Sequence, residues 1–480
     1  MTYAVHNKYA VHNNEDRRRM LDAIGICCVE ELFAVVPPSL QLPAAPLGPG
    51  LSEQETQSRL EALAGANRPM GHHSFLGGGY YNHFVPAAVR SLVGRSEFAT
   101  AYTPYQPEVS QGTLQAMFEF QTTICELTGF DLSNASLYDG SSALAEAAFM
   151  GMRLTKRESL AISAGVHPEA AHTVQTYCTG PGINIHVLPL DPVQGTTCLR
   201  GTAPGPTPDS PDTSETDPLP AGTGVVLVQQ PNCLGVIEDI QSLAAAAHAA
   251  GALLVVMQNP VTMGVLAPPA AQQADIAVGD LQAFGNALSF GGPSAGYVAG
   301  RPEYLRNMPG RLVSQTVDED GRPCYVLTLQ GREQHIRRAR ATSNICSNQA
   351  LCALASTIHL CLLGPQGLVE LGEVCLQRAH YLHERLCALP GVRPTVQGPF
   401  FYEFSLRLPL PAETFVHRMR SGGIDPGIPV TRLAADPGAR LPLESHPEIE
   451  NDLLVAVTEM NRPEDLEHYA TLAKEVLEQS

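Results

Sequence analysis

The sequence predicts an α/β protein, in which a large domain with a mostly parallel sheet is followed by a smaller α+β domain. Two observations support this fold class. From residue 139 onward, short β-branched apolar runs alternate with helical stretches, which is typical of parallel strands buried on both faces. After residue 340, long helical stretches are followed by strand-like and helical pieces in alternation. The 480 residues leave room for such an arrangement, because a domain takes roughly 150 residues.

The chain begins with a short duplication. YAVHN occurs at 3–7 and again at 9–13. Two copies cannot form a solenoid, so a loose terminal arm is expected. Asn14 is placed to cap a helix over 16–24, which is expected to end at Gly25.

A second helix is expected before the large domain. Ser52 followed by Glu55 forms a capping box, and the helix should run through about Gly65. A proline-rich stretch at 37–50 links the two helices. Residues 1–65 are therefore assigned as an N-terminal arm with helices.

The large domain is assigned to residues 66–340. Its predicted strands are 159–163, 183–190, 225–229, 253–257 and 275–278, and its predicted helices are 142–155, 168–178 and 239–250. The stretch at 200–224 is rich in Pro, Ser, Thr and Asp. That composition indicates a surface insertion rather than a core element.

The remainder, residues 341–480, is assigned as a linking helix and a small α+β domain. The preceding segment 300–340 is rich in arginine and is expected to be irregular. The predicted elements are helices at 347–363, 368–389, 412–421 and 463–479 and a strand at 402–408, with Gly364-Pro365 separating the first two helices.

Composition limits the classes of partner. The charge of -18, from 48 acidic and 30 basic residues, repels phosphate backbones and anionic lipid, so neither nucleic acid nor membrane is expected as a partner. The 12 cysteines form no CxxC and no cluster with zinc spacing, so reduced thiols and no metal site are expected. The N-terminus has no apolar signal region. A cytoplasmic location is therefore expected.

Lysine is rare in this chain. Only Lys8, Lys156 and Lys474 occur among the 30 basic residues. None of them has the context of a phosphate-binding GxxxxGK loop, so a P-loop is excluded. Chemistry that needs a lysine amine would have to use one of these three side chains.

A glycine and two serines begin the helix predicted after residue 139. Gly140, Ser141 and Ser142 combine a small residue, two hydroxyls and a helix N-terminus, which together can hold a phosphate. The alternative is an ordinary helix cap without a ligand.

Aromatic and polar residues gather in two loop segments, 75–86 and 100–112. Such loops often line binding sites, because tyrosine offers a rigid ring with a polar tip. The alternative is a packed loop at a subunit boundary, and both interpretations stay open. The candidate residues are Tyr80, Tyr81, Asn82, His83, Tyr102, Tyr105 and Gln106.

Five segments carry a resemblance to a known family. They are FLGGGYYNHFVP (75–86), TAYTPYQPEVSQG (100–112), SNASLYDGSSALAEA (133–147), LSFGGPSAGYVA (288–299) and MPGRLVSQTVDEDGRPCYVLTLQGREQHIRRARATSNICSNQAL (308–351). In wording and order they resemble the α chains, or subunits 1, of two-chain glycine decarboxylases, the P-proteins of the glycine cleavage system. The resemblance covers most of the chain, from about residue 16 to near its end.

The resemblance implies a fold-type-I pyridoxal-phosphate (PLP) architecture without a cofactor lysine in this chain. Ala283 stands near the position expected for the Schiff-base lysine, and the strand at 253–257 is not followed by the acid that would hold the cofactor's pyridine nitrogen. PLP is therefore expected on a second chain, subunit 2, and Gly140, Ser141 and Ser142 would be a relic of its phosphate site.

The resemblance also implies an oxidoreductase activity that requires the partner. With subunit 2, this chain would decarboxylate glycine and pass the aminomethyl group to the lipoyl arm of H-protein, in an α2β2 heterotetramer. The seven loop residues named above would help to wall the glycine pocket or the lipoyl channel. The alternative is a purely structural subunit that stabilises the catalytic chain and docks H-protein.

Overall fold

A computed structural model describes residues 12–41, 50–67, 71, 73–99, 102–199, 219–434 and 448–479. The first YAVHN copy, Lys8 and most of the predicted insertion at 200–224 lie outside these residues. The chain divides into two compact units, Met1–Pro69 and Met70–Ser480. The domain boundaries predicted at 65/66 and 340/341 stay predictions.

The first unit contains the two predicted helices, α1 (Asn14–Ile24) and α2 (Glu53–Gly65), with short 3-10 helices η1 (Val29–Phe33) and η2 (Pro38–Leu40) between them. The prediction that Asn14 caps α1 is wrong by one residue. The Asn13 side chain accepts the backbone N–H groups of Glu15 and Asp16, both at 2.9 Å, and so leaves Asn14 inside the helix. The Ser52–Glu55 capping box of α2 is confirmed.

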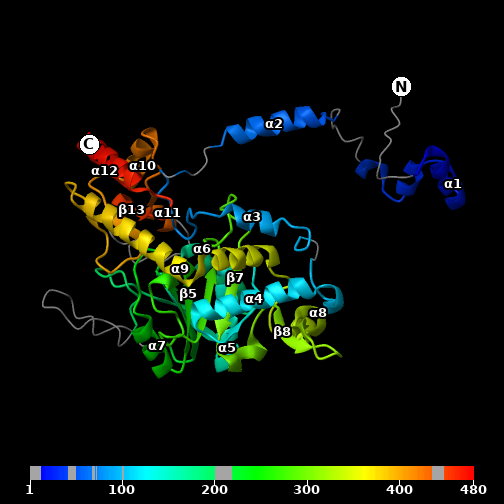
Figure 1. Cartoon of the computed structure of the whole chain (residues 1–480), viewed down its shortest axis with the longest axis horizontal. Coiled ribbons are helices and arrows are strands. Elements are labelled where there is room, and N and C mark those ends of the chain that lie inside the picture. The colour runs from blue at the N-terminus through cyan, green and yellow to red at the C-terminus, as the bar shows by residue number, and fades with distance from the viewer. Residues whose placement is uncertain are drawn as a thin grey trace. The chain divides into compact units, whose positions relative to one another are not determined.

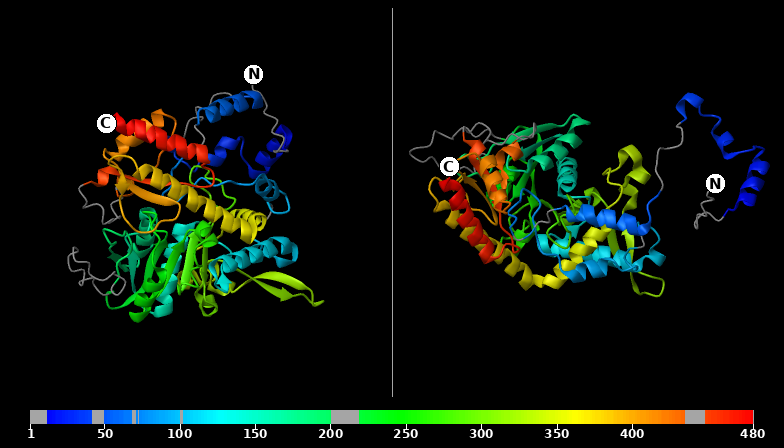
Figure 2. Two further views of the ribbon diagram at one scale, coloured as in Figure 1. Left: turned by 60° about the vertical axis from the view of Figure 1, so that its left-hand side comes forward. Right: turned by 90° about the horizontal axis from the view of Figure 1, so that it is seen from above.

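The second unit is built on a seven-stranded sheet with the order β1-β7-β6-β5-β4-β2-β3 (Figures 1 and 2). Its strands are β1 (Leu132–Ser133), β2 (Ser159–Ser163), β3 (Asn184–Leu188), β4 (Thr223–Gln230), β5 (Leu253–Gln258), β6 (Ile276–Asp280) and β7 (Gly296–Gly300). Strands β2 to β6 pair in parallel, whereas β7 is antiparallel to β6 and to β1. The five predicted strands are thus confirmed as the parallel part of the sheet.

Both faces of this sheet are buried, as the unbroken apolar runs predict. Val225 and Leu227 of β4 pack into one core cluster with α5 (Gly140–Thr155) and α6 (Pro168–Thr179). Val226 and Val228 point the other way, into a cluster that includes α7 (Ile240–Ala249). The same second cluster contains residues of α4 (Gln111–Thr128) and α9 (Ala350–Cys387), so helices cover the sheet on both sides.

The C-terminal part forms a four-stranded antiparallel sheet with the order β10-β11-β13-β12, as the prediction of a smaller α+β region requires. Its strands are β10 (Arg393–Pro394), β11 (Glu403–Arg407), β12 (Ile428–Pro429) and β13 (Asp452–Ala456), and its helices are α10 (Ala412–Ser421), α11 (Val430–Ala434) and α12 (Pro463–Glu478). Helix α9 runs beside both sheets (Figure 2).

Helix α9 is long and apolar enough to span a membrane by length and composition alone. It consists of two helices that meet at Gly364, whose φ of 66° is not helical, and at Pro365, as the sequence predicts. Its buried residues, among them Ala353, Cys375 and Leu382, belong to the main core cluster. The helix is therefore a core element of this unit.

Two regions differ from the prediction. The segment 300–340, expected to be irregular, contains a hairpin of β8 (Leu312–Val317) and β9 (Pro323–Thr328), which projects from the large sheet in Figure 2. Its turn is held by Asp318, whose side chain accepts the N–H groups of Asp320 and Arg322. Helices α3 (Ala87–Val93) and α4 and strands β1, β7 and β13 were also not predicted. In β7 the small residues Gly296 and Gly300 obscure the β-branched pattern that marks the other strands.

Candidate functional site

A cavity of about 370 Å³ opens at the carboxyl ends of the parallel strands. Ligands of open α/β sheets bind at this edge. Gln229, Gln258 and Asp280 reach the cavity from the ends of β4, β5 and β6. Six of the predicted site residues line it together: Tyr80, Tyr81, Gly140, Ser141, Ser142 and Ala283.

The glycine run before Tyr80 exists because the chain passes close to a buried carboxylate from β11. A Cβ on Gly77 would lie 2.1 Å from Glu403 Oε1, a separation that no side chain can occupy. Gly78, at a φ of 74°, donates its N–H to the same oxygen at 2.7 Å. The loop at 77–79 is thus shaped by Glu403, and only glycine fits this approach at position 77.

Glu403 is the most unusual ionisable group in the cavity. Its second oxygen accepts the Tyr81 hydroxyl at 2.9 Å, and no cationic side chain acts on it in the described part of the chain. Burial without a counter-ion raises the pKa of Glu403 to about 7. Burial, and then the Glu403 charge, likewise raise the pKa of Tyr81. The carboxylate can therefore change its protonation near neutral pH.

The predicted phosphate cradle is present as geometry, but two of its backbone donors are occupied. Gly140 donates its N–H to Asp280 Oδ2 at 2.9 Å, and Ser142 donates its N–H to Asp139 Oδ1 at 2.7 Å. The other Asp280 oxygen accepts the Gln282 N–H at 2.8 Å and the Ser294 hydroxyl. Two carboxylates therefore stand at the helix N-terminus, where a phosphate would need positive charge.

These carboxylates also affect Tyr80. Burial first, and then the charges of Asp280 and Asp139, raise the pKa of Tyr80. Burial also raises the pKa of Asp280. The hydroxyl of Tyr80 is thus held in its neutral form at the same end of the cavity as the two acids.

The residues of this cavity do not fit PLP. Ala283 lines the cavity where an amine would be needed. Lys156 is the C-terminal cap of α5, and the 16 residues of that helix place it about 24 Å from the cavity end. Lys474 lies in α12, where it pairs with Glu478 at 3.7 Å. Strand β5 ends with Gln258 and continues to Asn259, so neither supplies the acid for a pyridine nitrogen.

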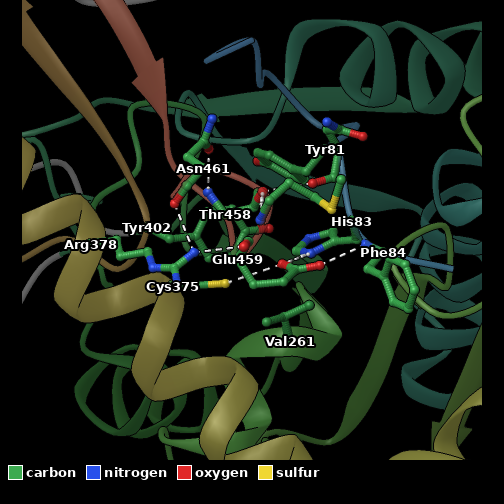
Figure 3. Close-up of polar contacts among 12 residues, drawn as sticks. Tyr81, His83, Phe84, Val261, Cys375, Arg378, Tyr402, Thr458, Glu459 and Asn461 are labelled. Carbon is green, nitrogen blue, oxygen red and sulfur yellow. Dashed lines mark hydrogen bonds and ion pairs between the residues drawn. The ribbon is translucent and has the colours of Figure 1, made fainter. Parts of the chain in front are cut away.

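His83 and Asn82 do not line the cavity. His83 is buried, and its Nδ1 lies 2.8 Å from Glu459 Oε2 (Figure 3). The other Glu459 oxygen accepts the Phe84 N–H at 2.7 Å, and Cys375 Sγ lies 3.6 Å from Oε2. His83, Cys375 and Glu459 offer ligand atoms within 4.8 Å of one another, but these hydrogen bonds already account for both carboxylate oxygens. This cluster fixes the loop to the C-terminal region.

The other three predicted residues lie on the surface, away from the cavity lining. Tyr102 is 82% exposed and Tyr105 is 51% exposed, and Gln106 is exposed beside them. The Arg311 guanidinium lies over the Tyr105 ring, 5.7 Å from its centroid. Six of the seven loop candidates thus form two groups, with Tyr80, Tyr81 and His83 turned inward and Tyr102, Tyr105 and Gln106 turned toward solvent. The seventh, Asn82, is half-buried, and its backbone carbonyl accepts the Thr458 hydroxyl at 2.6 Å.

Sequence reasoning missed Glu403 and gave Asp280 no role. Asp280 ends a strand next to a glycine- and serine-rich return, which is a signal that could have identified it. Glu403 follows three aromatic residues, Phe400, Phe401 and Tyr402, and begins a strand more than 300 residues from the loop it shapes. No local pattern connects the two segments.

Comparisons with known proteins agree with this architecture. The profile of the glycine cleavage system P-protein family matches residues 7–424. The chain is 44% identical over 468 residues to the probable glycine dehydrogenase (decarboxylating) subunit 1 of Geotalea uraniireducens, which covers 98% of this chain and 99% of the relative. It is 44% identical to the protein of the same description from Moorella thermoacetica, with coverage of 96% and 98%.

Solved structures give the same result. A crystal structure of glycine decarboxylase (P-protein) of the glycine cleavage system, in inhibitor-bound form, superimposes with a TM-score of 0.85 at 42% identity and covers 98% of this chain and 100% of that chain. Glutamate decarboxylase of Lactobacillus brevis has a TM-score of 0.62 at 12% identity, with coverage of 93% and 97%, and shows the shared PLP-enzyme fold alone. The chain therefore belongs to the glycine cleavage system P-protein family, as a subunit 1 of the decarboxylating glycine dehydrogenases.

Proposed function

We propose that this chain is the subunit without a cofactor lysine in a two-chain glycine decarboxylase. In this proposal PLP is bound by subunit 2, which decarboxylates glycine only when assembled with this chain, and the aminomethyl group passes to the lipoyl arm of H-protein. The expected assembly is an α2β2 heterotetramer. The observation that carries the proposal is Ala283, which lines the cavity at a place where no described lysine reaches.

The chemistry divides accordingly between the chains. PLP supplies an electron sink for decarboxylation wherever it is bound. This chain contributes positioning and exclusion of water at the shared site. Its own cavity holds carboxylates at the helix N-terminus instead of an anion site.

We infer that the exposed loop group meets subunit 2. Tyr102, Tyr105 and Gln106 are exposed on one short segment, and Phe290 is 99% exposed on another glycine-rich loop. Tyrosines of this kind supply much of the binding energy at protein interfaces. In the proposal these residues wall the glycine pocket or the lipoyl channel, and the inward residues Tyr81 and His83 position the loop behind them.

Co-expression tests the proposal. Glycine–bicarbonate exchange is measured for this chain alone, for subunit 2 alone and for both together. Activity is expected only from the pair. Exchange by this chain alone would contradict the proposal, because it has no amine placed for the cofactor.

A purely structural subunit is the second candidate. The inward position of Tyr81 and His83, both bonded within their own chain, favours it. The double variant Tyr102→Ala/Tyr105→Ala separates the two. If the chain contributes to the shared site, exchange falls at least about ten-fold while the complex elutes intact, since about 1.4 kcal/mol of lost transition-state stabilisation has that effect. Unchanged exchange supports the structural role; Tyr381→Ala, at an exposed tyrosine of α9, is the matched control.

We further propose a cytoplasmic location. All 12 cysteines lie in the described part of the chain and all are free thiols. Reduced thiols in this number suit a reducing compartment.

A further inference from the structure

We propose that an arginine-rich surface of this chain docks a carboxylate-rich surface of subunit 2. The proposal rests on the two-chain assembly proposed above and adds the place and the chemistry of one contact between the chains. It is supported by exposed arginines without counter-ions, by a buried arginine without a counter-ion and by the position of Tyr105. We call the following residues the arginine surface: His335, Ile336, Arg337, Arg338 and Arg340.

The arginine surface carries one sign of charge. Its three arginines are exposed and lie at the end of α8 (Gln334–Arg337) and in η8 (Arg338–Arg340). None of the three forms an ion pair with a described residue. The one acid of the segment 332–340, Glu333, is buried, and its Oε2 lies 3.7 Å from His335 Nδ1. Three positive charges are therefore exposed without counter-ions on a chain whose net charge is -18.

A buried arginine adds to the positive potential of this region. Arg311 is 3% exposed, and its guanidinium donates to three neutral acceptors. They are Asn348 Oδ1 at 3.2 Å, the Cys346 carbonyl at 3.0 Å and the Tyr105 hydroxyl at 3.5 Å. No carboxylate in the described part of the chain pairs with Arg311. Because a charge acts over several ångströms, Arg311 raises the potential outside Tyr105 without itself having to touch a partner.

Tyr105 connects the arginine surface to the exposed loop group. The centroid of its ring lies 6.2 Å from that of His335, and the Arg311 guanidinium lies over the same ring. Tyr105 is 51% exposed and Ile336 is 52% exposed. Arginine and tyrosine are the residue types that contribute most at protein interfaces. The arginine surface therefore continues the interface that we infer for Tyr105.

The chemistry of the guanidinium group identifies the occupant. Arginine donates two parallel hydrogen bonds to one carboxylate, which gives such a contact both strength and direction. Phosphate groups bind arginine in the same way, but the net charge of -18 repels nucleic acid and anionic lipid. A protein surface with aspartate and glutamate side chains fits best. Continuity with Tyr105 assigns that surface to subunit 2.

Zero-length cross-linking of the assembled complex tests the proposal, because lysine is rare in this chain. Arg338→Lys and Arg340→Lys, made singly, keep the positive charge and place an amine in the arginine surface. A water-soluble carbodiimide then joins that amine to a carboxylate in ionic contact with it. Mass spectrometry of the digested complex should find position 338 or 340 linked to an aspartate or glutamate of subunit 2. Links to carboxylates of this chain alone, a link to added H-protein instead of subunit 2, or no link would overturn the proposal.

Arg393→Lys, on the small antiparallel sheet, is the matched control. Arg393 pairs with Glu448 at 2.7 Å, so this variant should become linked to Glu448 of its own chain and not to subunit 2. A link from position 393 to subunit 2 would show that the cross-links do not report a specific contact, and would overturn the assignment. The failure of this inference is distinct from that of the proposed function, which exchange activity of this chain alone would contradict.

Removing the charges gives a second measurement. Arg337→Gln/Arg338→Gln/Arg340→Gln should weaken the association with subunit 2 about ten-fold at about 0.1 M NaCl, and the difference should vanish at about 1 M NaCl, where exposed charges are screened. Arg385→Gln/Arg393→Gln/Arg432→Gln removes three exposed charges elsewhere and should associate like the native chain. Circular dichroism shows that both variants are folded. An equal loss of affinity in the two variants, or a loss that does not depend on salt, would overturn the proposal.

Discussion

Replacing Glu403 with glutamine should change the pH dependence of stability. The native carboxylate accepts the Gly78 N–H at 2.7 Å and the Tyr81 hydroxyl at 2.9 Å, with no cation beside it. In Glu403→Gln the amide oxygen can keep the Gly78 bond, and the amide nitrogen can donate to the Tyr81 oxygen. The variant therefore keeps the shape of the loop and removes the buried charge.

The size and sign of the effect follow from the raised pKa of Glu403. Burial moves that pKa from 4.5 to about 7. Between these values the folded chain binds more protons than the unfolded chain, so stability falls as pH rises through this range. The shift corresponds to about 3 kcal/mol in the free energy of unfolding. The native chain loses this stabilisation by pH 8, and Glu403→Gln does not.

Urea midpoints at pH 5 and pH 8 measure this effect. The two proteins should have similar stability at pH 5, and Glu403→Gln should be more stable by up to about 3 kcal/mol at pH 8. The exposed Glu126→Gln variant on α4 controls for the change of net charge. If the difference between Glu403→Gln and the native chain is the same at both pH values, Glu403 is not a buried acid that titrates near neutrality.

Three further changes have expected outcomes. Gly77→Ala forces a Cβ onto Glu403 Oε1 and should lower the melting temperature by many degrees or prevent folding. An unchanged melting temperature would contradict the close approach, because the loop would then have moved away from Glu403. Arg407→Leu removes the cation that donates bonds of 2.7 and 2.8 Å to the buried carboxylate of Asp452, and leaves the Thr395 hydroxyl, at 3.1 Å, as a neutral donor; it should cost about 3–5 kcal/mol in urea denaturation, and a loss below 1 kcal/mol would contradict a paired buried ion. Asn13→Ala removes the cap of α1 and should lower the stability of the helix by about 1 kcal/mol, measured by amide exchange. An equal effect of Asn14→Ala would contradict the cap assignment.

The parallel strands could be predicted because each one is a complete local signal. The run 253–257 is short, β-branched and apolar, and the structure has β5 at Leu253–Gln258. The hairpin β8–β9 carried a weaker signal, since the turn-forming sequence DEDG lies between two β-branched runs within an arginine-rich segment. Strand β1, with two residues, has too little sequence to be recognised.

The cavity could be predicted in part. Glycine and serine at a helix start and the absence of a placed lysine are local facts, and both Gly140 and Ala283 line the cavity. The charge of the cavity could not be predicted locally, because Asp280 and Glu403 enter from separate strands. Asp280 accepts the Gly140 N–H, which a phosphate would need, and Glu403 accepts the Gly78 N–H, which shapes the tyrosine loop. Composition alone could not separate Tyr81, which is buried, from Tyr102, which is exposed.

Borohydride reduction of the assembled two-chain complex tests the central claim most directly. Reduction fixes PLP to whichever lysine holds it, and mass spectrometry of the separated chains identifies that chain. The proposal predicts a pyridoxyl group on subunit 2 and an unmodified mass for this chain. A pyridoxyl group on Lys8, Lys156 or Lys474 would contradict it.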